Sequence, residues 1–466
     1  MKNLLLTLVL ALSTFRITAQ HTKLLDFDDV LKGTVPEGDL LLVGPFMYGL
    51  TYSGGTNDDG TIFKIKPDGT GFSKLLDFSD TATGVNPLGS LIYEGTFLYG
   101  LAEEGGTNDN GVIFKIKPDG TGFVKLLNLE SFETGGRPEG SLLFVSPFLY
   151  AMTNIGGEYN DGTIIRIKPD GTGYAKILEF EGVVNGRNPS GTLISDGTFL
   201  YGLTRRGGEN NTGTAFKIMP DGTGFVKLLD FIGPTNGTFP YGDLIIDGNF
   251  LYGMTSEGGA NNFGTIFKLR TDGTGYQKLL DFAGFPSSDE AFGNLIFDGT
   301  FLFGLTATGG TNDRGTLFKI RPDGTGFVKL LSFVGPNTGS YPDGSLISDG
   351  TFFYGTTTGG GTNGDGTIFK YKEPTTAIDE LNMASDFTLY PNPTTGKCIF
   401  KTGTTTDPDY TLEIFNATGE RVFIHSKTSG QTTFQIDLSG YPAGIYLAKI
   451  QGTSVITTKR IVLQKN

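Results

Sequence analysis

The sequence of 466 residues contains no tryptophan, one cysteine and two histidines. Because Cys398 is the only cysteine, a disulfide within the chain is excluded. The histidines, His21 and His425, lie outside the repeated part of the sequence described below, residues 23–372. A histidine-based catalytic triad or a histidine-ligated metal is therefore excluded within the repeats.

Charged residues are also scarce, at 18% of the chain, and acidic residues outnumber basic ones by 49 to 36. The resulting net charge of −13 argues against nucleic acid as a partner, because phosphate backbones are bound by basic surfaces. Abundant instead are glycine (72), phenylalanine (38) and tyrosine (18). Glycine-rich, aromatic-rich chains are typical of many short strands joined by tight turns, so we predict an all-β fold.

The N-terminus has the pattern of a secretory signal peptide. Lys2 supplies a positive charge, residues 4–12 are apolar, and Ala19 ends a small-residue cleavage site before Gln20. The apolar run is too short to span a bilayer. We therefore predict that residues 1–19 are a signal peptide and that the mature protein is exported.

A repeat of 51 residues dominates the remaining sequence. An aromatic residue recurs at this spacing without insertion or deletion, at Tyr48, Tyr99, Tyr150, Tyr201, Tyr252, Phe303 and Tyr354. A phenylalanine two residues earlier and a glycine pair six residues later recur in every copy. Seven copies of one unit indicate a repeat architecture with one structural element per copy.

Each copy is predicted to form four short antiparallel strands. In the second copy these are Ser90–Tyr93, Phe97–Ala102, Val112–Lys117 and Phe123–Leu129. A Pro-Asp-Gly turn at residues 118–120 suits a tight hairpin between the last two strands. Four strands repeated seven times predict a seven-bladed β-propeller over residues 20–372.

The ends of the array predict how the propeller closes. Residues 23–27 match residues 74–78, the fourth strand of the first copy, but no strands of the same copy precede them. The seventh copy stops after its third strand, at residues 367–372. We therefore expect the N-terminal strand to complete the last blade and remove the free sheet edges.

These repeats resemble the GloVer tandem-repeat family. The matching motifs in the second copy are residues 97–101 (FLYGL), 105–108 (GGTN) and 111–115 (GVIFK). Members of this family carry such units beside varied C-terminal anchoring domains. The resemblance implies a repeat architecture but brings no activity and no catalytic residues.

After the repeats, residues 373–386 are predicted to be a linker, and residues 387–466 are patterned differently. They contain, in order, residues 390–396 (YPNPTTG), 412–422, 436–438 (IDL) with 443–446 (AGIY), and 459–462 (KRIV). These motifs resemble the C-terminal sorting domain of the type IX secretion pathway of Gram-negative bacteria. Short strands of alternating apolar and polar residues in this segment predict a small Ig-like β-sandwich. The resemblance implies that this domain directs the chain to the type IX machinery, its expected partner, and to a secreted or cell-surface location. An adhesive Ig-like module without a sorting role is the alternative.

The sequence indicates no catalytic residues, metal or cofactor. The loop at residues 54–60 is rich in glycine but lacks the Lys-Ser/Thr ending of a phosphate-binding loop. Asp58 and Asp59 are possible calcium ligands, but the corresponding pair varies among the copies, and only this copy has two carboxylates.

Variation among the copies predicts a binding surface. The two residues before each glycine pair differ from copy to copy, as do the ten residues before each first strand, such as 130–139 and 232–241. In an up-and-down blade both regions fall on one rim, and variable loops on a rigid scaffold commonly carry binding. The candidate binding residues are Tyr52, Glu103, Glu104, Arg205 and Arg206. Neutral drift at exposed positions would produce the same variation.

These patterns predict an exported binding module for an extracellular ligand, either a glycan or a protein. One alternative is a hydrolase of extracellular polysaccharide; another is a structural component of the cell surface. Equal repeat lengths argue against the hydrolase, because catalytic propellers generally carry insertions that build an asymmetric pocket. The absence of tryptophan also weakens a sugar-stacking site, although tyrosine and phenylalanine can stack.

Overall fold

The computed structural model describes residues 20–284, 288–289, 293–373, 387–392, 394–402, 410–416, 420–426, 433–452 and 456–465. The chain divides into two compact units, residues 1–373 and 374–466. The predicted signal peptide (residues 1–19) and residues 374–386 of the predicted linker lie outside the described residues. The prediction of an all-β chain is confirmed, since strands form nearly all of its regular structure.

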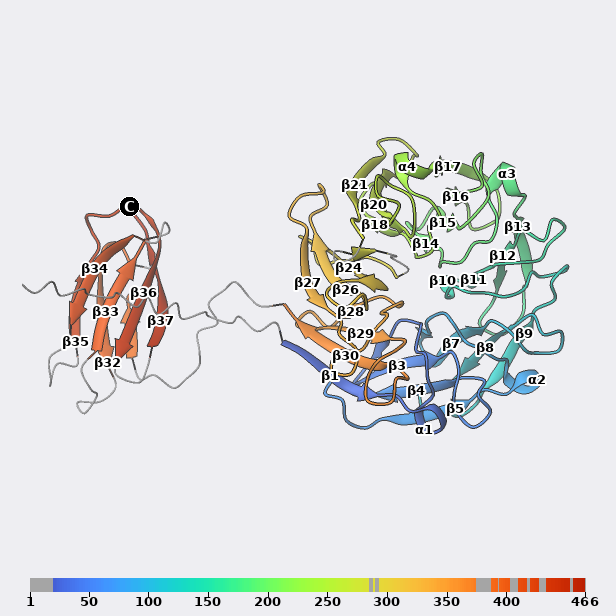
Figure 1. Cartoon of the computed structure of the whole chain (residues 1–466), viewed down its shortest axis with the longest axis horizontal. Coiled ribbons are helices and arrows are strands. Elements are labelled where there is room, and N and C mark those ends of the chain that lie inside the picture. The colour runs from blue at the N-terminus through green and yellow to red at the C-terminus, as the bar shows by residue number, and fades with distance from the viewer. Residues whose placement is uncertain are drawn as a thin grey trace, which may run out of the picture. The chain divides into compact units, whose positions relative to one another are not determined.

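The described part of the larger unit contains seven four-stranded antiparallel sheets arranged around a common centre (Figure 1). In six sheets the strands lie in chain order. The first three sheets consist of β2 (Leu41–Val43), β3 (Phe46–Thr51), β4 (Thr61–Ile65) and β5 (Ser73–Asp77); β6 (Ile92–Glu94), β7 (Phe97–Ala102), β8 (Val112–Ile116) and β9 (Val124–Asn128); and β10 (Leu143–Val145), β11 (Phe148–Thr153), β12 (Thr163–Ile167) and β13 (Ala175–Glu179).

The next three sheets repeat this order. They consist of β14 (Ile194–Ser195), β15 (Leu200–Thr204), β16 (Thr214–Ile218) and β17 (Val226–Asp230); β18 (Ile245–Asp247), β19 (Phe250–Thr255), β20 (Thr265–Arg270) and β21 (Gln277–Asp281); and β23 (Ile296–Phe297), β24 (Leu302–Thr306), β26 (Thr316–Ile320) and β27 (Val328–Ser332). A two-stranded ladder joins β22 (Ser288–Asp289) to β25 (Thr308–Gly309). The first strand of each sheet is shorter than predicted; in the second copy it begins at Ile92, not Ser90.

Within the described residues of the larger unit, four one-turn helices follow fourth strands, and none of them was predicted from the sequence. They are α1 (Asp29–Lys32), α2 (Asp80–Thr83), α3 (Gly182–Asn185) and α4 (Gly233–Asn236). Each ends at a glycine with positive φ, whose N–H bonds back to the first helical carbonyl, as Gly33 N does to Asp29 O at 3.1 Å. The φ of +88° at Gly33 is a conformation that other residues rarely adopt, so the turn stops there.

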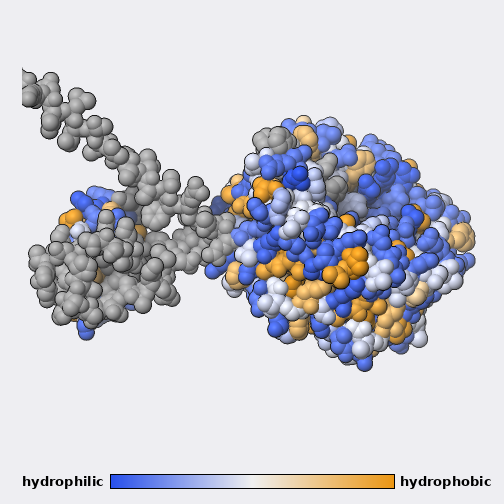
Figure 2. All heavy atoms as spheres, turned by 60° about the horizontal axis from the view of Figure 1, so that its bottom comes forward, coloured by the Kyte–Doolittle hydropathy of each residue, from blue (hydrophilic) through white to orange (hydrophobic). Residues whose placement is uncertain are grey.

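Apolar contacts between neighbouring sheets form the core of the larger unit. One cluster, for example, joins Leu50 and Ile62 of the first sheet to Leu98, Phe114 and Ile116 of the second. Each sheet is therefore buried on both faces, which explains why its strands carry apolar residues on both faces. The visible outer surface is mainly hydrophilic, with apolar residues in scattered patches (Figure 2).

Packing inside a sheet explains one departure from the repeat. The second strand carries glycine in its middle in six copies because a Cβ there would collide with the phenylalanine on the third strand, 2.5 Å away for Gly100 and Phe114. In the third copy both residues change together, to Ala151 and Ile165, which are paired across β11 and β12. The smaller isoleucine leaves room for the alanine methyl group.

A second departure is also paired. In six copies two buried threonine hydroxyls bond each other across the second and third strands, as Thr51 and Thr61 do at 2.9 Å. The second copy has Ala102 and Val112 instead, both fully buried. Replacing both partners leaves no hydroxyl unsatisfied, whereas replacing one would.

The last sheet combines segments from both ends of the larger unit. β1 (Gln20–Asp26) pairs antiparallel with β30 (Thr367–Lys372), beside β29 (Phe353–Thr357) and β28 (Ile347–Ser348), so the bluest strand lies against an orange one in Figure 1. Its contacts match those of β5. Thr362 N and Oγ1 bond Asp26 at 3.1 and 3.0 Å, as Thr56 N and Oγ1 bond Asp77 at 2.9 and 3.1 Å.

β1 begins three residues earlier than the predicted strand, and this corrects the placement of His21 outside the repeats. His21 pairs with Tyr371 and stacks on Phe369, with ring centroids 5.7 Å apart. Burial, together with the positive charge of Lys23, lowers the pKa of His21 to about 4. The histidine is therefore a neutral packing residue of the last sheet at ordinary pH.

The described part of the smaller unit contains two antiparallel sheets with a shared core. One consists of β31 (Phe387–Tyr390), β32 (Lys397–Thr402) and β35 (Thr433–Asp437); the other of β34 (Arg421–Ser426), β33 (Tyr410–Phe415), β36 (Gly444–Gly452) and β37 (Ile456–Leu463). Phe400 from the first sheet packs with Leu412 and Ile414 from the second. Burial in this core raises the pKa of the Cys398 thiol to about 11, so the thiol is an inert packing group.

The role of β1 can be tested at Phe27, which directly follows the strand and is fully buried against Phe63. Phe27→Ala should lower the free energy of unfolding by about 3–5 kcal/mol, as expected for a buried phenylalanine. The matched control is Phe78→Ala, since Phe78 occupies the same position after β5 and packs in the same way on Phe114. Chemical denaturation should give similar losses for both; a negligible loss for Phe27→Ala alone would show that β1 is detached in solution.

Candidate functional site

Seven equivalent polar residues, one from each copy, surround the centre of the larger unit. Each follows a glycine and comes just before the first strand of its sheet. We call them the axial ring: Asp39, Ser90, Ser141, Thr192, Asp243, Asn294 and Ser345. Glycine is required before the ring residue because the backbones of neighbouring copies approach each other closely there. A Cβ at Gly38, for example, would lie 2.4 Å from Gly89 O.

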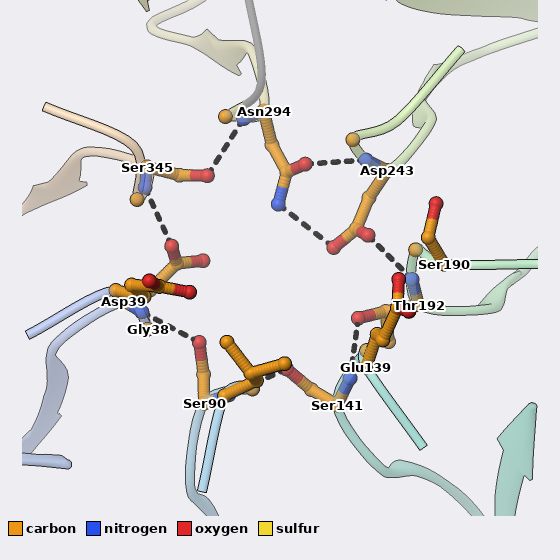
Figure 3. Close-up of a pocket in the computed structure, with 18 of the residues that line it drawn as sticks. Gly38, Asp39, Ser90, Glu139, Ser141, Ser190, Thr192, Asp243, Asn294 and Ser345 are labelled. Atoms are coloured by element: carbon orange, nitrogen blue, oxygen red, sulfur yellow. Dashed lines mark hydrogen bonds between the residues drawn. The ribbon is translucent and has the colours of Figure 1, made fainter. Parts of the chain in front are cut away.

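A continuous circuit of hydrogen bonds links the axial ring (Figure 3). In each bond the backbone N–H of one ring residue donates to a side-chain oxygen of the ring residue in the next copy. The pairs are Asp39 N to Ser90 Oγ (2.7 Å), Ser90 N to Ser141 Oγ (2.7 Å), Ser141 N to Thr192 Oγ1 (2.9 Å), Thr192 N to Asp243 Oδ1 (2.5 Å), Asp243 N to Asn294 Oδ1, Asn294 N to Ser345 Oγ (2.7 Å) and Ser345 N to Asp39 Oδ1 (2.6 Å). The last bond joins residues 306 positions apart, so the seventh copy meets the first.

The axial ring and its neighbours line an open cavity of about 390 Å³. Its wall includes the residues that precede the ring glycines, among them Glu37, Glu139, Tyr241 and Asp343, together with Arg205. Five carboxylates and one guanidinium thus line it, counting Asp39 and Asp243 of the ring. The cavity is polar and strongly acidic.

The acidic groups disfavour one another's ionisation. Burial, followed by the charges of Asp343, Glu103 and Glu139, raises the pKa of Glu37 to about 7. Burial and the charges of Glu139 and Glu104 raise the pKa of Glu103 to about 7 as well. Inside the ring, burial raises the pKa of Asp243 to about 7 against the opposing hydrogen bond from Thr192 N. These groups therefore titrate near neutral pH, where small changes in their surroundings alter their charge.

One of the five predicted binding residues lines the cavity, and two others lie close to its acidic wall. Arg205 lines it, with its guanidinium 5.2 Å from the centroid of the Tyr241 ring. Burial and the charge of Glu139 raise the pKa of Glu103, and burial together with Glu103, Glu104 and Glu37 raises the pKa of Tyr52. We call Glu37, Tyr52, Glu103, Glu139, Arg205, Tyr241 and Asp343 the mouth residues.

The other two predicted residues are engaged with neighbouring loops. Glu104 forms an ion pair with Arg137 at 2.8 Å, and Arg206 lies over the ring of Phe239, 5.5 Å from its centroid. The backbone of Glu104 also pairs with Val85, through hydrogen bonds of 2.9 and 3.1 Å. The two variable regions of the sequence are thus joined to each other in the structure.

The axial ring and four of the mouth residues were not predicted from the sequence. A signal for the ring was present, because glycine recurs at residue 38 and every 51 residues after it, always followed by a polar residue. Glu139 and Tyr241 end the variable ten-residue segments, but nothing in the sequence shows that they face one cavity. Among the described residues no group of three or more His, Cys, Asp or Glu side chains is arranged to hold a metal ion. No helix in the described ranges has the length and apolar character needed to span a membrane.

Comparison with family models shows which family the chain belongs to. The model of the Gloeobacter/Verrucomicrobia repeat matches residues 12–182, 131–296 and 246–407, most of the sequence. The chain belongs to the Gloeobacter/Verrucomicrobia repeat family. In this repeat protein, residues 388–464 match the secretion system C-terminal sorting domain. That domain marks the chain for type IX export to the cell surface or the extracellular space.

A search of curated proteins found no relative of this repeat protein. Among solved structures it is similar to an extracellular domain assigned to a one-component system of B. thetaiotaomicron (12% identity, TM-score 0.46), covering 93% of this chain but only 57% of that one. The similarity to an oligogalacturonate lyase in complex with manganese (12% identity, TM-score 0.46) covers 77% of this chain and 94% of the lyase chain. A Bacteroides fragilis protein assigned as a 6-phosphogluconolactonase (16% identity, TM-score 0.45) covers 86% and 96%.

The acidic mouth predicts a pH-dependent effect of removing one carboxylate. The pKa of Glu37 is raised to about 7 from an ordinary value of 4.5, so the folded state of the repeat protein binds this proton more tightly than the unfolded state does. The contribution of protonated Glu37 to the free energy of unfolding is fully present below pH 4.5 and is lost as pH rises through 7. Glu37→Gln, which cannot ionise, should therefore raise the melting temperature relative to wild type more at pH 8 than at pH 5.

The control for this measurement is Glu94→Gln, the same chemical change at an exposed residue that ends a first strand, away from the cavity. The difference in melting temperature between Glu94→Gln and wild type should be the same at pH 5 and pH 8. An equal effect of Glu37→Gln at pH 5 and pH 8 would contradict the mutual repulsion at the mouth.

Proposed function

We propose that this chain is an exported binding protein in which the seven sheets form a seven-bladed β-propeller, closed by β1, with the ligand held at the axial cavity. The domain boundaries of the proposal are a signal peptide at 1–19, the propeller at 20–372, a linker at 373–386 and an Ig-like sorting domain at 387–466. The observation that carries the proposal is the circuit of seven hydrogen bonds around a polar cavity.

The contrast between ring and mouth supports a binding role. The axial ring uses one geometry in every copy, which makes the cavity a rigid frame. The mouth differs from copy to copy: the residue before the ring glycine is Glu37, Glu139, Tyr241 or Asp343 in four of them. A uniform frame with varied groups around one opening suits recognition of an asymmetric ligand.

The size of the cavity limits what enters it. A volume of about 390 Å³ is at the small end of ligand pockets, which run from about 300 to 1,000 Å³. A small polar molecule, one sugar ring of a glycan, or one side chain of a protein partner fits this space. Type IX export would present the cavity to such ligands outside the cell.

The proposal is tested by probing the exported full-length protein on glycan and peptide arrays beside a double variant, Glu103→Ala with Arg205→Ala. The variant removes one group of each charge from the mouth and leaves the axial ring intact, so its melting temperature should stay close to that of wild type. Binding of any array ligand should fall at least about tenfold, as expected when charged contacts are lost.

The Glu94→Gln variant serves as the control and should bind as wild type does. A ligand that the double variant still binds normally would place the binding site elsewhere. If no glycan and no peptide binds the exported wild-type protein, the binding role itself is wrong.

A further inference from the structure

In every copy one antiparallel bridge joins the loop before the first strand to the loop after the second strand. The residues opposite each other in these bridges are Thr34 and Ser53, Val85 and Glu104, Gly136 and Ile155, Arg187 and Arg206, Thr238 and Glu257, Asp289 and Thr308, and Ser340 and Gly359. Among these described pairs, only Arg187 and Arg206 carry charges of the same sign. Their backbones exchange two hydrogen bonds, of 2.9 and 3.1 Å.

This bridge places two positive side chains together. Residues directly opposite each other in an antiparallel pair share one face, with Cα atoms about 5.5 Å apart. Like charges in this position disfavour the pairing. The scaffold does not need them, because the other six copies form the bridge without two like charges. An arrangement that disfavours the fold and serves no structural need indicates a function for both cations.

The protein itself does not neutralise either cation. No ion pair or hydrogen bond joins the side chain of Arg187 or Arg206 to another described residue. By contrast, Arg137 pairs with Glu104 at 2.8 Å. Arg187 buries its Nε, which leaves Nη1 and Nη2 as its donors at the surface. Arg206 is exposed, and its contact with the Phe239 ring holds the side chain in place without using an N–H donor.

Arg187 and Arg206, which we call the rim pair, lie outside the axial cavity. Arg205 lines the cavity, and its charge opposes the rise in the pKa of Glu139. Neither member of the rim pair lines the cavity. A ligand of the rim pair is therefore independent of the ligand proposed for the cavity.

The donors and the charge of the rim pair select the chemistry of its ligand. A guanidinium donates through a planar fork that fits two oxygens of a carboxylate or a phosphate. A carboxylate has two oxygens and one negative charge, so one arginine is enough to bind it. A phosphate monoester has three terminal oxygens and a charge of about −1.5 to −2 at pH 7, which matches two guanidinium groups.

We propose that Arg187 and Arg206 form a binding site for a phosphate monoester, on the rim of the larger unit and outside the cavity. Nη1 and Nη2 of Arg187 and the N–H groups of Arg206 donate to the terminal phosphate oxygens. A phosphorylated sugar, a lipid with a terminal phosphate headgroup and free phosphate share this chemistry. Type IX export brings the site to such groups outside the cell.

The test is calorimetric titration of the exported full-length protein, at constant ionic strength, with three phosphate probes: inorganic phosphate, ribose 5-phosphate, and phosphatidylcholine vesicles that contain phosphatidic acid. Their matched probes are acetate, ribose and vesicles of phosphatidylcholine alone. At least one phosphate probe should bind at least about tenfold more tightly than its matched probe. The probe that binds identifies the source of the phosphate group.

Arg206→Gln and Arg187→Gln should each weaken binding of that probe at least about tenfold, because each removes one charged donor fork. The matched control is Arg314→Gln. Arg314 also follows a second strand and lies over an aromatic ring, 5.9 Å from the centroid of Tyr341, but it is not part of a like-charged bridge. The control should bind phosphate as wild type does.

Melting temperatures separate lost binding from misfolding. Without phosphate, Arg206→Gln should melt at or slightly above the temperature of wild type, because one of two like charges is gone. The bound phosphate probe should raise the melting temperature of wild type but not that of Arg206→Gln.

Failure of all three phosphate probes to bind, or full affinity in both rim-pair variants, would overturn the proposal. An equal loss of binding in Arg314→Gln would show general attraction by surface charge and no site. Acetate bound as tightly as phosphate would exclude the phosphate monoester.

Discussion

The bond from a backbone N–H of one copy to a side chain of the next, repeated around the axial ring, is the interaction on which the rest of this structure depends. It fixes where every sheet begins, since each ring residue comes just before a first strand. It also satisfies N–H groups that would otherwise be buried unpaired beside the cavity. Because an acceptor must be present at each position, the side chains are serine, threonine, asparagine or aspartate and never apolar. The acidic cavity is a consequence of this ring and of the residues next to it.

Further from the axis, a second set of contacts links the copies. Lys115 Nζ on the third strand of one sheet bonds the carbonyl of Pro169 in the hairpin turn of the next, at 2.8 Å, and Lys64 reaches Pro118 at 3.3 Å. The same cations lie over phenylalanine rings, as Lys115 does over Phe97 at 4.9 Å. Apolar side chains fill the space between the sheets. Each copy thus contacts its neighbours in three ways: through the axial hydrogen bonds, through the lysine contacts and through apolar packing. β1 supplies the fourth-strand contacts for the seventh copy, which has no fourth strand of its own.

The 51-residue period made much of the fold predictable. Strand positions in the second copy agree with the sequence to within one or two residues. The pairing of β1 with the last sheet was predictable because residues 23–27 repeat residues 74–78. The short helices were missed because their sequences share little beyond a terminal glycine. The paired changes Ala151 with Ile165 and Ala102 with Val112 are also present in the sequence. Their meaning requires knowing which residues face each other across two strands.

The site was less accessible to sequence reasoning. Variation pointed to Arg205, which lines the cavity, and to Tyr52 and Glu103, which lie close to its acidic wall. The same argument selected Glu104 and Arg206, which pack on adjacent loops. Variation shows that a position is unconstrained by the scaffold, not which way its side chain faces. The axial ring is uniform, and for that reason a search for variable residues passes over it.

Closure of the ring is most directly measured by hydrogen exchange at the backbone amides of Ser90 and Ser345 in the exported protein. Both amides donate to a side-chain oxygen at the axis, but Ser90 bonds the adjacent copy whereas Ser345 bonds Asp39 at the other end of the array. If the seventh copy meets the first in solution, both amides should be protected to a similar degree. Protection of Ser90 with rapid, unprotected exchange of Ser345 would show an open array and contradict a closed propeller.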